Sequence, residues 1–153
     1  MSDRVSASIT IGGLVTPDQF AQLAGLIMAE GLATEWGGED FAPDNRTPGE
    51  PLNLFAHEVP WGRFEALEQY CCDQGIAYRR WSGSCPGSFG AERIVFDGSN
   101  GPFNYDTNED DEIMLSVATI SQLGSMRAIH DYLKPAEIEI PPLLIASSVR
   151  AAG

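Results

Sequence analysis

The chain has 153 residues, of which 43% are hydrophobic, and its 22 acidic against 9 basic residues give a formal net charge of −13. A chain of this length can bury a core of its own, so we expect a single acidic domain over residues 1–146 and a frayed tail over residues 147–153. The charge argues against direct binding of nucleic acid or of an anionic membrane surface, because both are themselves negatively charged.

The apolar stretches of the sequence are all much shorter than the roughly 20 residues needed to cross a bilayer. The first residues lack the apolar core of a signal peptide. Three cysteines, Cys71, Cys72 and Cys85, make an odd number, and the first two are adjacent. An odd set of this kind favours reduced thiols over a disulfide framework, and we expect a cytoplasmic protein without membrane contact.

The first predicted elements are a strand and a helix. Residues 5–11 alternate apolar and small polar side chains, which is typical of a strand with one buried face. Thr16, Pro17 and Gln19 then form an N-cap signal, and Gly31 marks the helix end. The apolar face expected for this helix consists of Phe20, Leu23, Ala24, Ile27 and Met28.

A polar loop and a second strand–helix pair follow. Residues 35–51 are rich in Gly, Pro and acidic side chains, which predicts a surface loop, with a short strand at 32–36 beside it. Residues 52–59 are predicted to form a strand. Residues 61–74 are predicted to form a helix that buries Phe64, Leu67 and Cys71.

The second half of the chain is expected to contribute mostly strands. Residues 76–81 and 93–96 are predicted to pair as a hairpin around a glycine-rich loop. A polar stretch over 97–112 precedes a predicted strand over 113–117. Cap signals at Thr119 and Ser125 then predict a broken helix that ends near Leu133.

This order of elements predicts an α+β fold, with a mainly antiparallel sheet and helices packed on one of its faces. A ferredoxin-like arrangement is the candidate for its core.

The acidic segment 106–112 resembles the start of a calcium-binding EF-hand loop, since Asp106, Asn108 and Asp110 occupy its positions 1, 3 and 5. The match fails at position 6, where Asp111 replaces the usual glycine, and at position 12, where Val117 replaces a bidentate glutamate. We therefore predict no metal site here. The segment is either a solvated loop or a charge patch aimed at basic residues of a partner.

The charge-patch interpretation defines the predicted partner-binding residues. They lie in two acidic segments and include one tryptophan that a partner could bury. The predicted set is Asp106, Glu109, Asp110, Asp111, Glu112, Glu39, Asp40 and Trp36. A purely solubilising role for the same charges is the alternative.

The cysteines and His57 are the candidates for catalytic or zinc chemistry. Cys85 in its flexible loop and His57 beside Glu58 could form a nucleophilic pair, although nothing in the spacing requires it. Cys71, Cys72, Cys85 and His57 lack the paired spacing of zinc ligands. We predict no catalytic residue, no metal and no cofactor.

Three stretches, at residues 5–13 (VSASITIGG), 56–64 (AHEVPWGRF) and 80–87 (RWSGSCPG), carry a family resemblance. The chain resembles small acidic proteins of proteobacterial plasmids and integrative elements over about its first two thirds. The resemblance implies a context of antirestriction and other counter-defence functions, and it assigns no functional residue.

Charge and resemblance together predict a non-catalytic acidic protein that inhibits or adapts a partner with a basic surface. Such a partner would be a defence nuclease or a CRISPR effector, whose nucleic-acid groove the acidic protein would occupy as a mimic. An immunity protein for a toxin is the alternative within the binding class. A small enzyme using Cys85 and His57 is the alternative from another class.

Overall fold

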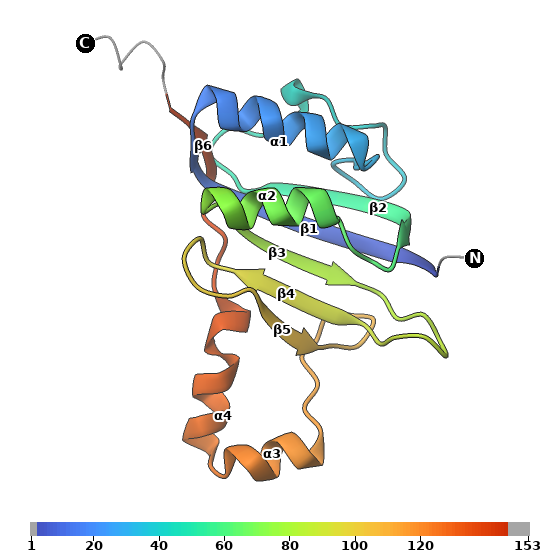
Figure 1. Cartoon of the computed structure of the whole chain (residues 1–153), viewed down its shortest axis with the longest axis vertical. Coiled ribbons are helices and arrows are strands. Elements are labelled where there is room, and N and C mark those ends of the chain that lie inside the picture. The colour runs from blue at the N-terminus through green and yellow to red at the C-terminus, as the bar shows by residue number, and fades with distance from the viewer. Residues whose placement is uncertain (1–2, 147–153) are drawn as a thin grey trace.

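The computed structural model describes residues 3–146, which form an α+β fold built on a six-stranded sheet (Figure 1). The strands are β1 (Arg4–Val15), β2 (Leu52–Pro60), β3 (Ala77–Ser82), β4 (Glu92–Phe96), β5 (Phe103–Asp106) and β6 (Leu143–Ile145). Five of them follow the order β2-β1-β3-β4-β5 with antiparallel pairing throughout. Strand β6 pairs in parallel with the end of β1.

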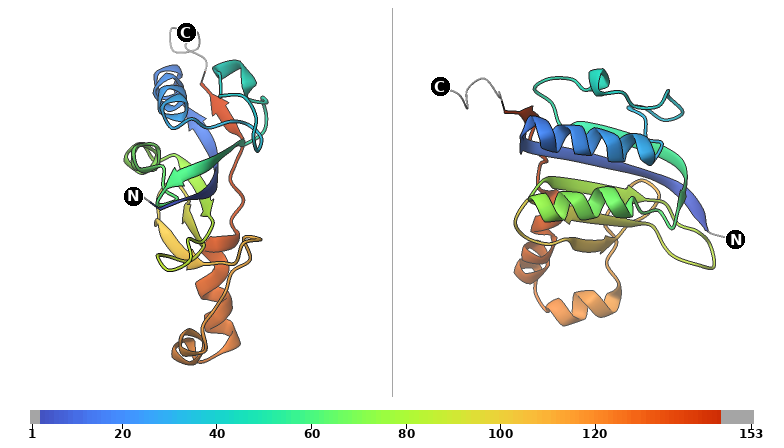
Figure 2. Two further views of the ribbon diagram at one scale, coloured as in Figure 1. Left: turned by 90° about the vertical axis from the view of Figure 1, so that its right-hand side faces the viewer. Right: turned by 45° about the horizontal axis from the view of Figure 1, so that its top comes forward.

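Two helices, α1 (Pro17–Ala29) and α2 (Glu65–Gln74), cover one face of this sheet (Figure 2). The predicted N-cap of α1 is confirmed, since the Thr16 hydroxyl accepts from the Gln19 amide and the Gln19 side chain returns to the Thr16 amide. Gly75 ends α2 in the left-handed conformation, which a residue without a Cβ adopts easily.

The hydrophobic core lies between these helices and the sheet. Alternate residues of β1, Ala7, Ile9 and Ile11, point into it and are fully buried. They pack with residues of the helices and neighbouring strands, among them Leu23, Ile27, Leu54, Phe64, Leu67, Cys71 and Tyr78. The period-two pattern of β1 therefore assigns its other side chains, Ser6, Ser8 and Thr10, to the opposite face.

The C-terminal chain crosses part of that opposite face as a strap (residues 134–142), which begins with the short helix η2 (Lys134–Glu137) and leads into β6. Arg93 Nη1 donates to the Ala136 carbonyl at 2.9 Å, and Arg79 Nη1 donates to the Ile138 carbonyl at 3.5 Å. The Gly13 amide donates to Pro142 at 3.1 Å, which brings the strap alongside β1. The strap thus covers the second face of the sheet near Arg79, Arg93 and Gly13.

Two further helices, α3 (Val117–Leu123) and α4 (Met126–Leu133), belong to an arm (residues 113–133) that projects beyond the β5 edge (Figures 1 and 2). Ser116 and Ser125 cap the two helices, and Gly124 separates them in the left-handed conformation. The arm is joined to the sheet through Tyr105, whose hydroxyl donates to the Tyr132 carbonyl at 2.9 Å.

Most predicted elements are confirmed, including the hairpin, in which Tyr78 pairs with Phe96 and Ser82 with Glu92. The strand predicted over 113–117 is wrong. Only Ile113 makes a bridge, to Thr107, and the Ser116 hydroxyl begins α3 because it caps the Thr119 amide. Strand β5 lies inside the stretch that was predicted to be polar loop.

Three other expectations need correction. The strand expected at 32–36 reduces to bridges at Ala33, and Met28 is half exposed because it lies at the rim of α1 rather than on its buried face. The ferredoxin-like order β-α-β-β-α-β differs from the observed β-α-β-α-β-β-β start of the chain. The tail predicted over 147–153 lies outside the described residues.

Candidate functional site

Five side chains lie on one part of the sheet surface opposite α1 and α2, and we call this part the open face. They are Ser6, Ser8, Phe55, His57 and Trp81. Cross-strand partners share a face of a sheet, and Ser8 is paired with Phe55 on one side and with Trp81 on the other. Ser6 and His57 share a hydrogen bond of 2.8 Å between Oγ and Nδ1. These side chains are partly or fully accessible, so this surface combines aromatic rings with small hydroxyl groups.

Trp36 covers the β2 side of the open face. Its ring lies 4.9 Å from that of Phe55 and 5.0 Å from that of His57, while 45% of the residue remains exposed. The loop that carries it is tied to β2, because Ala33 and Phe55 exchange backbone hydrogen bonds of 2.8 and 3.0 Å. Ala33 also forms a bridge to Asp40 on its side away from β2. The first acidic segment, Glu39 and Asp40, therefore lies along the β2 border of the open face.

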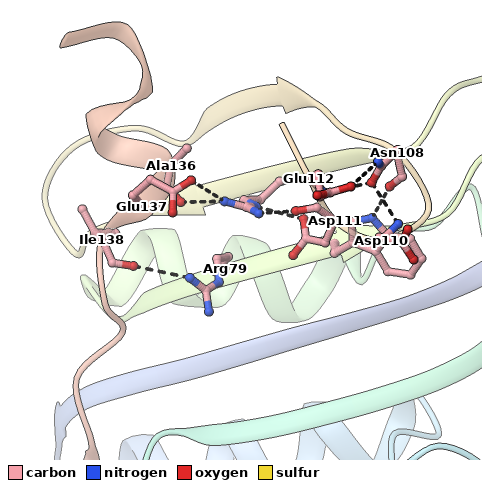
Figure 3. A network of polar contacts seen from close by, with 10 residues as sticks. Arg79, Asn108, Asp110, Asp111, Glu112, Ala136, Glu137 and Ile138 are labelled. Atoms are coloured by element: carbon pink, nitrogen blue, oxygen red, sulfur yellow. Dashed lines mark hydrogen bonds and ion pairs between the residues drawn. The ribbon is translucent and has the colours of Figure 1, made fainter. Parts of the chain in front are cut away.

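The second acidic segment, residues 106–112, borders the β4 side of the open face (Figure 3). Trp81 Nε1 donates to the Asn108 carbonyl at 3.2 Å, so the acidic loop starts against the open face itself. Arg93 Nε then lies 2.9 Å from Asp111 Oδ1, and the same guanidinium donates to the Asp111 carbonyl. Asp111 therefore anchors the loop, with its backbone in the left-handed conformation.

Asp106, the first carboxylate of this segment, is paired across the strands with Glu92, which contacts Arg80 beneath α2, so Asp106 lies on the helix-covered face and not on the open face. The other four carboxylates fall into two groups. Glu109 accepts from the Ser84 amide and hydroxyl, and Glu112 accepts from the Asn108 side chain at 2.7 Å. With Asp111 bound to Arg93, these three side chains also hold the loop in shape. Asp110 is exposed, and within residues 3–146 its carboxylate has no hydrogen-bond or ion-pair partner, which leaves it free for a partner molecule.

One row of cross-strand partners connects the two predicted patches. It runs through Asp40, Ala33, Phe55, Ser8, Trp81 and Arg93, the partner of Asp111. Five strand spacings separate the ends of the row, which places the acidic borders roughly 24 Å apart. The fold thus brings Trp36, Asp40 and the 106–112 loop to the margins of one surface, although some 70 residues separate them in the sequence.

The basic residues do not balance this surface. Arg80 and Arg93 are buried and paired with carboxylates, and Arg46 lies over the Phe20 ring at 5.7 Å. Arg79, on the same face as Trp81, is partly buried and donates to the Ile138 carbonyl of the strap. The exposed basic residues in the described chain are Arg4, Arg63, Arg127 and Lys134. Most of the 22 carboxylates remain exposed, so the surface carries nearly all of the negative charge.

The Cys85–His57 pair has no support from the hydrogen bonds of the described residues. The His57 ring bonds to Ser6, whereas the backbone of Cys85 closes its own loop with Phe89 through amide bonds of 2.9 and 3.0 Å. The other thiols are poor nucleophiles, because burial raises the pKa of Cys71 to about 12 and burial likewise raises the pKa of Cys72. In residues 3–146, no group of three or more His, Cys, Asp or Glu residues has a metal-binding arrangement.

Cys85→Ser is expected to leave the protein's effect in the cell unchanged, because the structure gives this thiol only a place in a loop. Its melting temperature should change by less than the few degrees that correspond to about 1 kcal/mol. The measurement is activity in the host together with thermal unfolding. Loss of activity in a variant with unchanged melting would instead favour the Cys-dependent enzyme.

The comparisons with known proteins return no match: no protein-family model, no curated protein and no solved structure is similar to this chain. Between residues 3 and 146, no helix is long and apolar enough to span a bilayer. The sequence patterns did not indicate Ser6, Ser8 and Phe55 as site residues, because their relevance comes from cross-strand pairing with residues far away in the chain.

Proposed function

We propose that this protein is a non-catalytic binding protein that acts in the cytoplasm and inhibits or adapts a protein partner with a basic surface. The observation that carries the proposal is the position of two acidic segments and Trp36 around one face of the sheet. A surface with carboxylates at its borders and exposed aromatic rings between them matches a basic protein surface. Charges at such borders speed association, and buried aromatic rings supply affinity.

The proposed partner class is a protein that binds nucleic acid, such as a defence nuclease or a CRISPR effector. Its groove presents lysine and arginine side chains to phosphates, and the acidic borders of the open face offer those side chains carboxylates instead. The counter-defence context implied by the sequence resemblance to plasmid proteins is the reason for naming this class. A toxin neutralised by an immunity protein is the alternative partner.

The decisive variant neutralises carboxylates at both borders without disturbing the loop contacts. Glu39→Gln, Asp40→Asn and Asp110→Asn change exposed side chains for which the described residues provide no ion pair. We expect the triple variant to associate with the partner about ten-fold more slowly and with a weaker salt dependence, since border charges act mainly on the on-rate. Surface plasmon resonance at two ionic strengths measures both effects.

The control triple removes the same number of negative charges from the two helices that cover the other face: Asp18→Asn, Glu65→Gln and Asp73→Asn. It should leave the association rate nearly unchanged. Equal slowing by both triples would show that net charge alone matters, and no slowing by either would exclude the acidic borders. Trp36→Ala completes the set, with an expected loss of about 2 kcal/mol of binding free energy that appears in the off-rate.

The partner is captured from the native host on the immobilised protein at low salt and identified by mass spectrometry. A partner of the proposed class competes: nucleic acid added to the purified complex displaces this protein. A stoichiometric partner that binds no nucleic acid and is toxic when expressed alone would favour the immunity protein instead. Turnover of a substrate would contradict both binding proposals.

A further inference from the structure

The arm (residues 113–133) has a composition and an exposure unlike the rest of the molecule. None of its residues is buried, although both of its helices are capped by serine hydroxyls. Helices of 7 and 8 residues are too short to be stable by themselves in water. Their stability must come from packing of their apolar side chains, and the monomer provides little of it.

The uncovered side chains are large and apolar. Val117 is 80% exposed and Met126 66%, and the other members of the set are Met114, Ile120 and Tyr132. All five lie in the arm, and exposed apolar patches of about a few hundred Å² mark interaction sites. Elsewhere in the described chain, the exposed large hydrophobic side chains are fewer in any one place, the closest being the cross-strand pair Leu14 and Leu144.

Charge identifies what can cover this surface. No acidic side chain occurs between Glu112 and Asp131, and in the sequence only the stretch between Asp73 and Glu92 is as long without one. The arm and the residue after it carry Arg127 and Lys134, two of the exposed basic residues. A basic partner would meet these cations, so the arm is not an extension of the acidic borders of the open face.

We propose that the arm is a dimerisation surface and that its occupant is the arm of a second copy of this chain. Two molecules of net charge −13 repel each other, and that repulsion is smallest where both present the arm, in which Asp131 is the one acidic residue. A two-fold axis through the arms would bring α3 and α4 of both copies into one four-helix cluster around Val117, Ile120 and Met126. The rim of such a cluster would extend each side toward the roughly 800 Å² of a standard interface.

The position of the arm is compatible with this role and with partner binding at once. The arm projects beyond the β5 edge of the sheet (Figure 1). Trp36 and Asp40 border the open face near β2, which lies at the opposite edge of the strand order. A dimer joined by its arms therefore presents two open faces. Two equivalent acidic surfaces on one particle would strengthen binding to a partner with repeated basic sites.

The test uses Val117→Asp combined with Met126→Glu. Both residues occupy the first position of their helix, where a carboxylate interacts favourably with the free amides, so the variant should remain folded. Sedimentation equilibrium should give twice the chain mass for the wild type and a dissociation constant at least ten-fold higher for the double variant. Added salt should tighten the wild-type dimer, because it screens the repulsion.

The matched control, Leu14→Asp with Met28→Glu, adds the same charge at exposed apolar positions outside the arm. It should remain dimeric. The proposal is overturned if the wild type is monomeric at its highest soluble concentration, or if both double variants dissociate alike. If the monomeric wild type also floats with vesicles of neutral phosphatidylcholine, the occupant of the arm is a lipid surface instead of a second copy.

Discussion

Arg80→Met is expected to lower the free energy of unfolding by about 3–5 kcal/mol, the cost of removing one partner from a buried ion pair. Arg80 lies between α2 and the sheet and is only 2% exposed. Its Nε atom is 2.8 Å from Glu68, and its Nη2 atom is 2.9 Å from Glu92. Methionine fills part of the space but leaves both carboxylates without a cation.

The guanidinium also joins backbone segments. Its Nη1 atom donates to the Gly62 carbonyl at 2.8 Å and to the Ser82 hydroxyl at 2.9 Å. Gly62 belongs to the turn that leads from β2 to α2, and Ser82 ends β3. Loss of Arg80 should therefore loosen the start of α2 as well as the sheet, which proton exchange of the α2 amides would reveal.

The pH dependence of stability provides a second readout. Burial raises the pKa of Glu92, but the hydrogen bonds from Arg80 and Asn104 outweigh it and hold the pKa below its usual value. In the wild type this carboxylate therefore adds stability above its unfolded pKa, and that stability is lost as the pH falls through the folded value. Without Arg80, burial dominates and the contribution of Glu92 changes sign, so that stability is lost as the pH rises.

Urea unfolding at about pH 4 and pH 7 measures the free energy of unfolding of the wild type and of Arg80→Met. The variant should lose more of this free energy at about pH 7 than at about pH 4. Arg79→Met is the matched control. This neighbour is only partly buried and makes a single bond of 3.5 Å to Ile138, so it should cost about 1 kcal/mol. Equal losses from the two arginines, or a loss that does not depend on pH, would contradict the proposed role of the buried network.

Gly12→Ala is the second large effect, with an expected loss of about 3 kcal/mol, at the upper end of the range for overpacking. A Cβ at this position would lie 1.7 Å from the Pro141 carbonyl oxygen and 2.8 Å from Cγ2 of Ile140. The first of these atoms is backbone, so no side-chain rotation can relieve the clash. The strap must move away from β1 instead.

Hydrogen exchange measures where the strap detaches. The amides of Leu143 and Ala146 donate to the Glu50 and Val15 carbonyls at 3.1 and 2.7 Å, and their protection should fall in the variant. Gly25→Ala is the control within α1. Apart from its chain neighbours and the backbone of its own helix, no atom of the described residues lies within 4 Å of the added Cβ, and alanine in a helix should stabilise by roughly 0.5–1 kcal/mol. Unchanged protection of Leu143 in Gly12→Ala would show that the strap tolerates the extra methyl group.

The sequence by itself determined the elements that depend on local signals. The period of two in β1 predicts its buried face, and the Thr16–Gln19 capping box predicts the start of α1, because both signals depend on residues a few positions apart. The acidic character of the surface also follows from composition alone. Strand β5 escaped prediction because four residues between glycine, proline and asparagine provide little periodicity.

Only the tertiary structure decided which acidic residues share a surface and which are occupied. Asp40 and Asp111 border one face because two isolated bridges, three strand pairings and the Arg93 ion pair connect them, and the partner of each strand is set by packing over the whole core. Asp111 is held by Arg93, while Asp110 beside it is free, and no pattern of like charges in a sequence distinguishes two such neighbours. Long-range pairing therefore defines the candidate site, whereas local patterns define the elements that carry it.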